Sequence, residues 1–257
     1  RRMNAPSLSR RGFLASAALT AAAASLHTRL SAAENAAGTK GRINHSACKW
    51  CYPKVSLEEL CTAGKEYGLT SIDLVGPGDF PTLKKHGLVC AMVTNPTVKG
   101  PDGKNIGGIE RAFNRKGNQD LLVPAYEAHI NAVADAGFKN LICFSGNRDG
   151  LDDETGLKNC AEGLKRIVPL AEKKGVVLTM ELLNSKVNHP DYMCDHTEWG
   201  AALAKTLGSP NFKLLYDIYH MQIMEGDVIA TIRKHHEAIS HYHTGGVPGR
   251  HEIDDTQ

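Results

Sequence analysis

The chain has 257 residues, of which 42% are hydrophobic, so it can bury the core of one sizeable domain. Its 30 Lys and Arg against 28 Asp and Glu leave a formal net charge of only +2. That balance argues against a nucleic-acid binder that depends on a broad basic face, and we expect a small molecule bound in a pocket.

The first residues have the features of an export signal. Arg10 and Arg11 precede an Ala-rich apolar run at residues 14–26 and small residues suited to cleavage. This pattern predicts a twin-arginine signal and linker over residues 1–40, and a periplasmic or exported protein. A disordered, Ala-rich N-terminus with an accidental arginine pair is the alternative. We therefore assign the fold to residues 41–257, where no stretch is suited to span a membrane.

Short apolar runs and amphipathic segments then alternate along the chain. Such runs are typical of strands buried on both faces, and repeated strand–helix units indicate parallel pairing with right-handed crossovers. Strands are predicted at residues 42–47, 70–75, 88–94, 140–145, 176–183, 212–216 and 239–243. Helices are predicted at residues 56–67, 80–86, 120–136, 153–174, 197–207 and 227–236.

This order predicts an α/β fold of the (β/α)₈ TIM-barrel type. Seven strand positions are found, so the barrel is expected to lack its C-terminal strand–helix unit in this chain. A doubly wound sheet is the competing architecture, but no Gly-x-Gly-x-x-Gly follows the first strand to support it. The Gly-rich segment at residues 95–118 is long enough to be a functional flap.

Seven cysteines cannot all pair within the chain. Cys48 and Cys51 have the spacing of a redox motif, but the motif ends a strand instead of opening a helix. A local disulfide after export is one interpretation, and two free thiols near the pocket is the one we favour.

Three chemically active side chains stand near the ends of successive predicted strands. They are Glu181, Asp217 and His243, and each interval between them is one strand–helix unit. The carboxyl ends of barrel strands meet at one face, so these side chains are predicted to form a divalent-metal site. A set rich in oxygen fits Mn²⁺, Mg²⁺ or Co²⁺ better than a structural zinc. Taken singly, Asp217 would be a helix cap and His243 a satisfied core histidine.

Three stretches carry a family resemblance. They are YDIYHMQIMEGD at residues 216–227, MELLN at 180–184 and GVPGRHE at 246–252. They resemble the hydroxypyruvate isomerase group of the xylose-isomerase-like TIM barrels, and the likeness extends in element order over residues 42–257. The superfamily also holds the ketose 3-epimerases and endonuclease IV. The resemblance implies one divalent metal held by a Glu, an Asp, a His or Gln, and a final Glu.

Carried over motif by motif, the resemblance makes Glu181 a metal ligand and the catalytic acid or base. Asp217 and His243 become the other two ligands, while His220 and Arg250 hold substrate oxygens. The final glutamate is expected about 30 residues after His243, one unit further on and therefore beyond residue 257. That glutamate is expected to supply the fourth ligand and the second acid–base group.

The implied activity is that of a metal-dependent isomerase acting on a small keto-acid or sugar through an enediolate. The guanidinium fork of Arg250 suits a substrate carboxylate, although a solvated loop arginine is an equal alternative. His243 stands where hydroxypyruvate isomerases can carry Gln, which favours a ketose 3-epimerase as the second candidate.

Two further classes of protein are alternatives to an isomerase or epimerase. A non-catalytic carbohydrate-binding barrel is the alternative of another class. An endonuclease IV-like enzyme would need more metal-binding His and Glu residues and a face for DNA. The expected partner is thus a small-molecule substrate, with no nucleic acid and no membrane after signal removal, and a homo-oligomer is left open.

Overall fold

The computed structural model describes residues 43–253. The chain divides into two compact units, Arg1–Asn44 and His45–Gln257, and all described helices and strands lie in the second. The predicted export signal, with Arg10 and Arg11, lies outside the described residues. Within residues 43–253, no helix combines the length and the apolar character needed to cross a bilayer.

Strands and helices alternate in the predicted order. The main strands are β1 (Ser46–Cys48), β2 (Ser71–Asp73), β5 (Asn140–Cys143), β6 (Val177–Leu182), β7 (Phe212–Asp217) and β8 (Ile239–His243). The α-helices are α2 (Leu57–Glu66), α3 (Phe80–Lys85), α4 (Lys116–Ala136), α5 (Asp153–Leu164), α6 (Val168–Lys174), α7 (Thr197–Leu207), α8 (Ile218–Met224) and α9 (Val228–His235). Three single turns of 3₁₀ helix, η1 (Lys49–Cys51), η2 (Pro77–Asp79) and η3 (His236–Ala238), complete the set.

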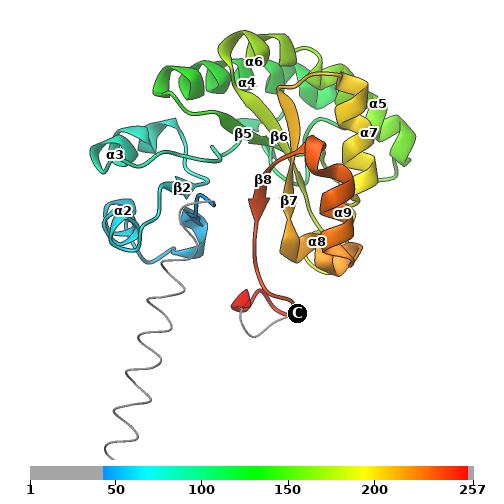
Figure 1. The fold of residues 1–257 in the computed structure, drawn as a ribbon. Coiled ribbons are helices and arrows are strands. Elements are labelled where there is room, and N and C mark those ends of the chain that lie inside the picture. Colours follow the sequence, from blue (N-terminus) through cyan, green and yellow to red (C-terminus); the bar gives the residue numbers. More distant parts are fainter. Residues whose placement is uncertain (1–42, 254–257) are drawn as a thin grey trace, which may run out of the picture. The chain divides into compact units, whose positions relative to one another are not determined.

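All pairing among the main strands is parallel. Strands β5, β6, β7 and β8 form a four-stranded sheet in chain order, and β1 pairs with β2. Residues 89–93 lie between these two sheets, bridged to β2 through Ser71↔Val89 and to β5 through Val93↔Leu141. Helices α4, α5, α6 and α7 cover the outer side of the four-stranded sheet (Figure 1). This is the arrangement of a TIM barrel, with its strands around a packed interior.

The third predicted strand, at residues 88–94, is irregular for a reason that the hydrogen bonds reveal. Ile72 N donates to Val89 O at 3.1 Å, and Leu74 N donates to Met92 O at 2.8 Å. An advance of two residues from Ile72 to Leu74 is therefore matched by three residues from Val89 to Met92 on the neighbouring segment. One extra residue bulges out there and interrupts the ladder.

Two other predictions need correction. The helix predicted at 153–174 is two helices, α5 and α6, separated at residues 165–167. Pro169 stands in the first turn of α6, and in a continuous helix its ring would clash with the carbonyl one turn earlier. The segment predicted as a loop at 95–118 contains a short antiparallel pair, β3 (Val98–Lys99) and β4 (Asn105–Ile106), and its last residues already belong to α4.

The register of β6, β7 and β8 positions the candidate site. Asp217 at the end of β7 is paired with His243 at the end of β8, and Glu181 in β6 is paired with Leu215. Leu215 and Asp217 share one face of β7, because side chains alternate along a strand. The three strand ends therefore present Glu181, Asp217 and His243 to the same region.

The connection between β6 and α7 is held by a buried ion pair. Asp195 is 3% exposed, and its carboxylate accepts hydrogen bonds from the Arg148 guanidinium at 3.0 and 3.2 Å and from Ser185 Oγ at 2.5 Å. Arg148 comes from the segment after β5, so two neighbouring connections are tied together. This fixes the backbone around Asn184, which contacts the site.

Candidate functional site

The structure brings the three predicted metal ligands together. Glu181, Asp217 and His243 each offer one ligand atom, and these atoms lie within 4.8 Å of one another. Glu181 is 7% exposed and Asp217 is 4% exposed. Glu181 Oε1 lies 3.2 Å from His243 Nδ1. Two carboxylates and an imidazole thus meet, largely shielded from water, at the carboxyl ends of three strands.

Asp217 also caps a helix, which is one of the two sequence interpretations of this residue, while it lies beside the other two candidate ligands. Its Oδ1 accepts a hydrogen bond from His220 N at 3.1 Å, at the start of α8. Such a cap satisfies one of the free N–H groups of the first turn. The second oxygen, Oδ2, remains directed at the site and lies 3.4 Å from Arg250 NH2.

The pKa values show how strongly these groups act on one another. Burial raises the pKa of Asp217 to about 6, and the negative charge of Glu181 adds to this rise while His243 opposes it. Burial alone would lower the pKa of His243, but its contacts with Asp73, Cys48 and Glu181 outweigh burial and raise that pKa well above the usual value. A bound cation would relieve the repulsion between the two carboxylates, and it would take the place of the proton on the imidazole.

The residues present therefore fit a divalent cation. Carboxylate oxygens are the donors that Mg²⁺ and Mn²⁺ prefer, and an imidazole nitrogen extends the choice to Co²⁺. Glu181, Asp217 and His243 would hold the ion, and a positive charge among them would relieve the repulsion that raises the pKa of Asp217.

His220 is fully buried and its orientation is fixed by Asn184. The side-chain oxygen of Asn184 accepts from Val187 N at 3.0 Å and Asn188 N at 2.9 Å, so its amide NH₂ faces His220 Nδ1 at 2.6 Å. The backbone N–H of Asn184 also donates to Nδ1, at 3.2 Å. Nδ1 is therefore the acceptor, and in the neutral ring the proton sits on Nε2, facing the site.

Burial, helped by the positive charges of Arg250, His189 and His243, lowers the pKa of His220 to about 3. The ring is thus neutral at physiological pH and acts as a fixed N–H donor toward the site. Arg250 NH2 lies 2.6 Å from Nε2, so the guanidinium contacts the ring at the edge of the site. An anionic oxygen beside the guanidinium would accept from the other N–H groups of its fork.

Arg250 is held over the site by aromatic rings. Its guanidinium lies 4.6 Å from the ring centre of Tyr219 and 5.3 Å from that of Trp50, both within cation–π range. The turn that carries it closes through a bridge between Gly246 and His251. The two predicted substrate contacts, His220 and Arg250, are therefore next to each other and next to Asp217.

Asp73, which the sequence did not single out, and Cys48, predicted as a free thiol near the pocket, also lie at the site. Asp73 ends β2 and is 1% exposed, and its Oδ2 lies 3.7 Å from His243 Nε2. Cys48 ends β1, with Sγ 3.8 Å from the same nitrogen, and both Cys48 and Cys51 are free thiols. The signal that pointed to Asp217, an acidic residue at the end of a buried strand, applies equally to Asp73.

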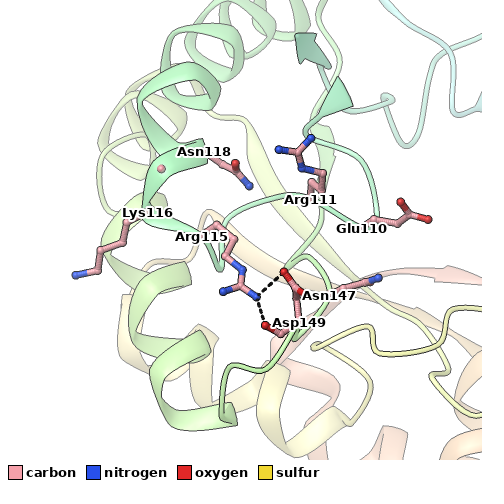
Figure 2. Close-up of a pocket in the computed structure, with 8 residues that line it drawn as sticks. Glu110, Arg111, Arg115, Lys116, Asn118, Asn147 and Asp149 are labelled. Carbon is pink, nitrogen blue, oxygen red and sulfur yellow. Dashed lines mark hydrogen bonds and ion pairs between the residues drawn. The ribbon is translucent and has the colours of Figure 1, made fainter. Parts of the chain in front are cut away.

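A hollow of about 400 Å³ is lined by residues of the segments 110–118 and 147–149, and none of the predicted site residues lines it (Figure 2). Its cationic side chains already have partners: Arg111 binds Asp102, Arg115 binds Asp149 and backbone carbonyls, and Lys116 binds Glu162. Among the described lining residues, therefore, each cationic side chain is already engaged by a partner within the protein. The chemistry of the strand ends, and not this hollow, identifies the candidate site.

Known proteins of related sequence are sugar and keto-acid isomerases by name. A 2-oxo-tetronate isomerase of Cupriavidus necator is 36% identical over 93 residues, which cover 36% of this chain and 35% of that protein. The match thus spans about a third of that relative's length. The hydroxypyruvate isomerase of Escherichia coli is 25% identical over 187 residues, covering 72% of each chain.

The fold is shared with solved structures. The crystal structure of a family 2 AP endonuclease from Brucella melitensis superimposes with a TM-score of 0.70 at 24% sequence identity, covering 84% of each chain. A family model, described as the xylose isomerase-like TIM barrel, matches residues 82–255. That span is more than half of the chain and includes Glu181, Asp217, His220, His243 and Arg250. The chain therefore belongs to the xylose isomerase-like TIM-barrel family.

Proposed function

We propose that this protein is a metal-dependent isomerase that acts on a small 2-keto acid or sugar, in the manner of a hydroxypyruvate isomerase. The observation that carries the proposal is the meeting of Glu181, Asp217 and His243 beside two fixed donors, His220 and Arg250. The names of the related isomerases support the same reaction class.

A divalent ion held by Glu181, Asp217 and His243, with Mn²⁺, Mg²⁺ or Co²⁺ as the candidates, would polarise the substrate carbonyl when bound. Glu181 is placed to remove the proton from the carbon beside that carbonyl, since a carboxylate at the edge of the ligand set can act as a general base. The neutral His220 ring would donate its Nε2 proton in a hydrogen bond to a substrate oxygen. Burial of the carboxylates keeps water from competing for the transferred proton.

Arg250 decides between acidic and neutral substrates. Its planar fork can bind both oxygens of a carboxylate, and Trp50 and Tyr219 hold its plane in position. A 2-keto acid such as hydroxypyruvate would therefore gain a charged contact that a neutral ketose lacks. The second candidate, a ketose 3-epimerase, is favoured by His243, the side chain that the family resemblance associates with the epimerases.

Turnover by the metal-loaded protein, compared for hydroxypyruvate and for D-fructose, tests the proposal. We expect hydroxypyruvate to be isomerised, turnover to stop on chelation, and Mn²⁺ to restore it. Arg250→Lys should raise KM for the keto acid by about tenfold or more, because a bidentate contact becomes a point contact, and should change KM for a neutral ketose little.

Arg233→Lys is the matched control, because Arg233 is an exposed arginine on α9, and it should behave as the wild type. Equal losses for both substrates in Arg250→Lys would favour a packing role for Arg250. Ligand affinity that survives complete metal removal, without turnover on either substrate class, would instead indicate a carbohydrate-binding barrel.

We also propose that the protein is exported through a twin-arginine signal containing Arg10 and Arg11. Replacing both with Lys is expected to leave uncleaved precursor in the cytoplasm, whereas Arg29→Lys, outside the motif, should not. Fractionation followed by detection of the protein in each compartment measures the effect. An unchanged periplasmic yield in the double variant would contradict the proposal.

A further inference from the structure

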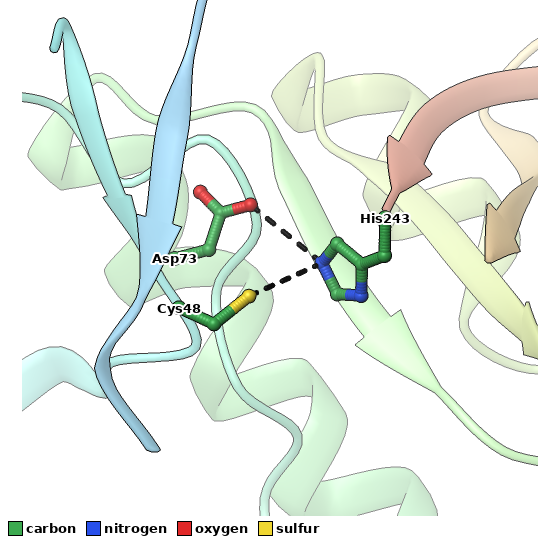
Figure 3. Close-up of side chains that lie close together, drawn as sticks. All are labelled: Cys48, Asp73 and His243. Atoms are coloured by element: carbon green, nitrogen blue, oxygen red, sulfur yellow. Dashed lines mark hydrogen bonds and ion pairs between the residues drawn. The ribbon is translucent and has the colours of Figure 1, made fainter. Parts of the chain in front are cut away.

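His243 faces two different sets of groups with its two ring nitrogens. Nδ1 lies 3.2 Å from Glu181 Oε1, on the side of the proposed isomerase metal. Nε2 faces the opposite way, 3.7 Å from Asp73 Oδ2 and 3.8 Å from Cys48 Sγ (Figure 3). One ligand atom from each of Cys48, Asp73 and His243 lies within 4.8 Å of the others. We propose that these three residues form a second metal site, suited to a borderline-soft divalent ion such as Zn²⁺.

The spacing of the three atoms suits a shared ion better than direct hydrogen bonds. The 3.7 Å between His243 Nε2 and Asp73 Oδ2 exceeds the length of an N–H···O hydrogen bond, and 3.8 Å to sulfur allows only a weak one. Ligands bound tetrahedrally to zinc, with bonds of about 2.0–2.3 Å, lie roughly 3.3–3.6 Å apart. The two distances from His243 Nε2 would therefore need to shorten by only a few tenths of an ångström around an ion, and the ligand atoms of Asp73 and Cys48 lie within 4.8 Å of each other.

Asp73 is prepared as a ligand by its own hydrogen bonds. Ser46 Oγ donates to Oδ1 at 2.6 Å, and His241 Nε2 lies 2.7 Å from Oδ2. With its side chain 1% exposed, the carboxylate is thus fixed in orientation, and each oxygen keeps a lone pair. Ligating carboxylates in metal sites are commonly held by such secondary hydrogen bonds. The strands β1, β2 and β8 supply the three ligands, so no loop has to fold around the ion.

A fourth ligand is available close by. Cys51 follows Cys48 with the two-residue spacing that is common among zinc-binding cysteine pairs. Cys51 is exposed, so its side chain can turn toward an ion without disturbing the core.

The two sites differ in the ions they prefer. Thiolate and imidazole ligands favour Zn²⁺, whereas carboxylates favour Mg²⁺ and Mn²⁺. They also share His243, whose neutral ring has one proton and one lone pair. An ion on Nε2 leaves the proton on Nδ1, where Glu181 Oε1 accepts it at 3.2 Å. Zinc in the second site would thus withdraw His243 from the first ion; this consequence rests on the proposed isomerase function, whereas the site itself does not.

Titration of the metal-free, reduced full chain with Co²⁺ tests the site, because a cobalt–thiolate bond gives a charge-transfer absorption that oxygen and nitrogen ligands do not. The measurement is made in the wild type and in Asp217→Asn, which weakens the first site. We expect the thiolate band to saturate at one ion per chain in both proteins. Added Zn²⁺ should remove it, because zinc binds such sites more tightly than cobalt.

Variants of the cluster complete the experiment. The double variant Cys48→Ser, Cys51→Ser should lose the band, and Asp73→Asn should weaken Co²⁺ binding by about tenfold or more. Cys61→Ala, which removes a buried thiol from α2, is the matched control and should keep both. A Zn²⁺-induced rise in the thermal midpoint of the wild type, absent in the double variant, would report the same site without absorption.

Two results would overturn the proposal: a wild-type protein that folds but shows no thiolate band, or a band that persists when Cys48 and Cys51 are both replaced by Ser. Isomerase turnover with Mn²⁺ is measured on the same wild-type preparation. Failure of the second metal site can therefore be distinguished from failure of the proposed function.

Discussion

Asp217→Asn is expected to lower the affinity for the proposed isomerase metal by at least about tenfold, and turnover with it, while leaving the fold stable. Asparagine keeps the oxygen that accepts from His220 N at 3.1 Å, so the cap of α8 survives. What is lost is the negative charge that Oδ2 offers to the cation. Metal content after dialysis, calorimetric titration with Mn²⁺ and the thermal midpoint measure the three quantities.

Two comparisons isolate the ligand role from the capping role. Asp152→Asn changes a second capping carboxylate, whose Oδ1 accepts from Thr155 N at 2.8 Å at the exposed start of α5, and should leave metal and turnover unchanged. Asp217→Ala removes both cap and ligand and should additionally cost about 0.5–2 kcal/mol of stability. Full metal occupancy in Asp217→Asn would mean that Asp217 is a cap alone.

Gly107→Ala is expected to destabilise the fold by about 3 kcal/mol, the largest effect on stability that we predict for a single methyl group. Gly107 has a φ of +107°, and a Cβ there would lie 2.3 Å from the carbonyl oxygen of Pro96. A backbone atom cannot move aside as the tip of a side chain can. Gly107 O also accepts from Asn95 Nδ2 at 2.8 Å, so any shift would break the contact that anchors the segment.

Gly137→Ala is the matched control, because it isolates the free-energy cost of a left-handed backbone from the cost of a steric clash. Gly137 ends α4 with a φ of +79°, and a Cβ there would meet nothing within 4 Å. Its cost should be about 1–2 kcal/mol, from the left-handed backbone alone. Chemical unfolding measures the loss of stability in both variants. It is sensitive to Gly107→Ala because the neighbouring Ile106 and Phe113 are buried in the common core. Equal losses of unfolding free energy in the two variants would show that the backbone around Gly107 shifts to accommodate the added methyl group.

Part of the candidate site follows from the sequence alone. Glu181, Asp217 and His243 could be predicted because each stands near the end of a short apolar run, and parallel strands separated by one helix bring their ends to the same face. The alternation of strands and helices could be predicted for the same reason. The pattern of each single strand or helix is local, so it can be recognised within a dozen residues of the chain.

Other features of the fold depend on packing that no local pattern reports. The bulge between β2 and residues 89–93 places one extra residue opposite β2, and the predicted strand there forms only isolated bridges. The capping role of Asp217 became certain only with α8, a helix of seven residues that the sequence analysis did not predict.

The chemistry around His243 was decided only by the tertiary structure. Cys48 and Asp73 lie far from His243 in the sequence, and they meet it because β1, β2 and β8 surround one interior. The proton position on His220 likewise depends on Asn184, a residue of another connection. A strand pattern predicts which residues reach the end of the barrel, but which atoms face each other there depends on register and on the hydrogen bonds that orient each ring.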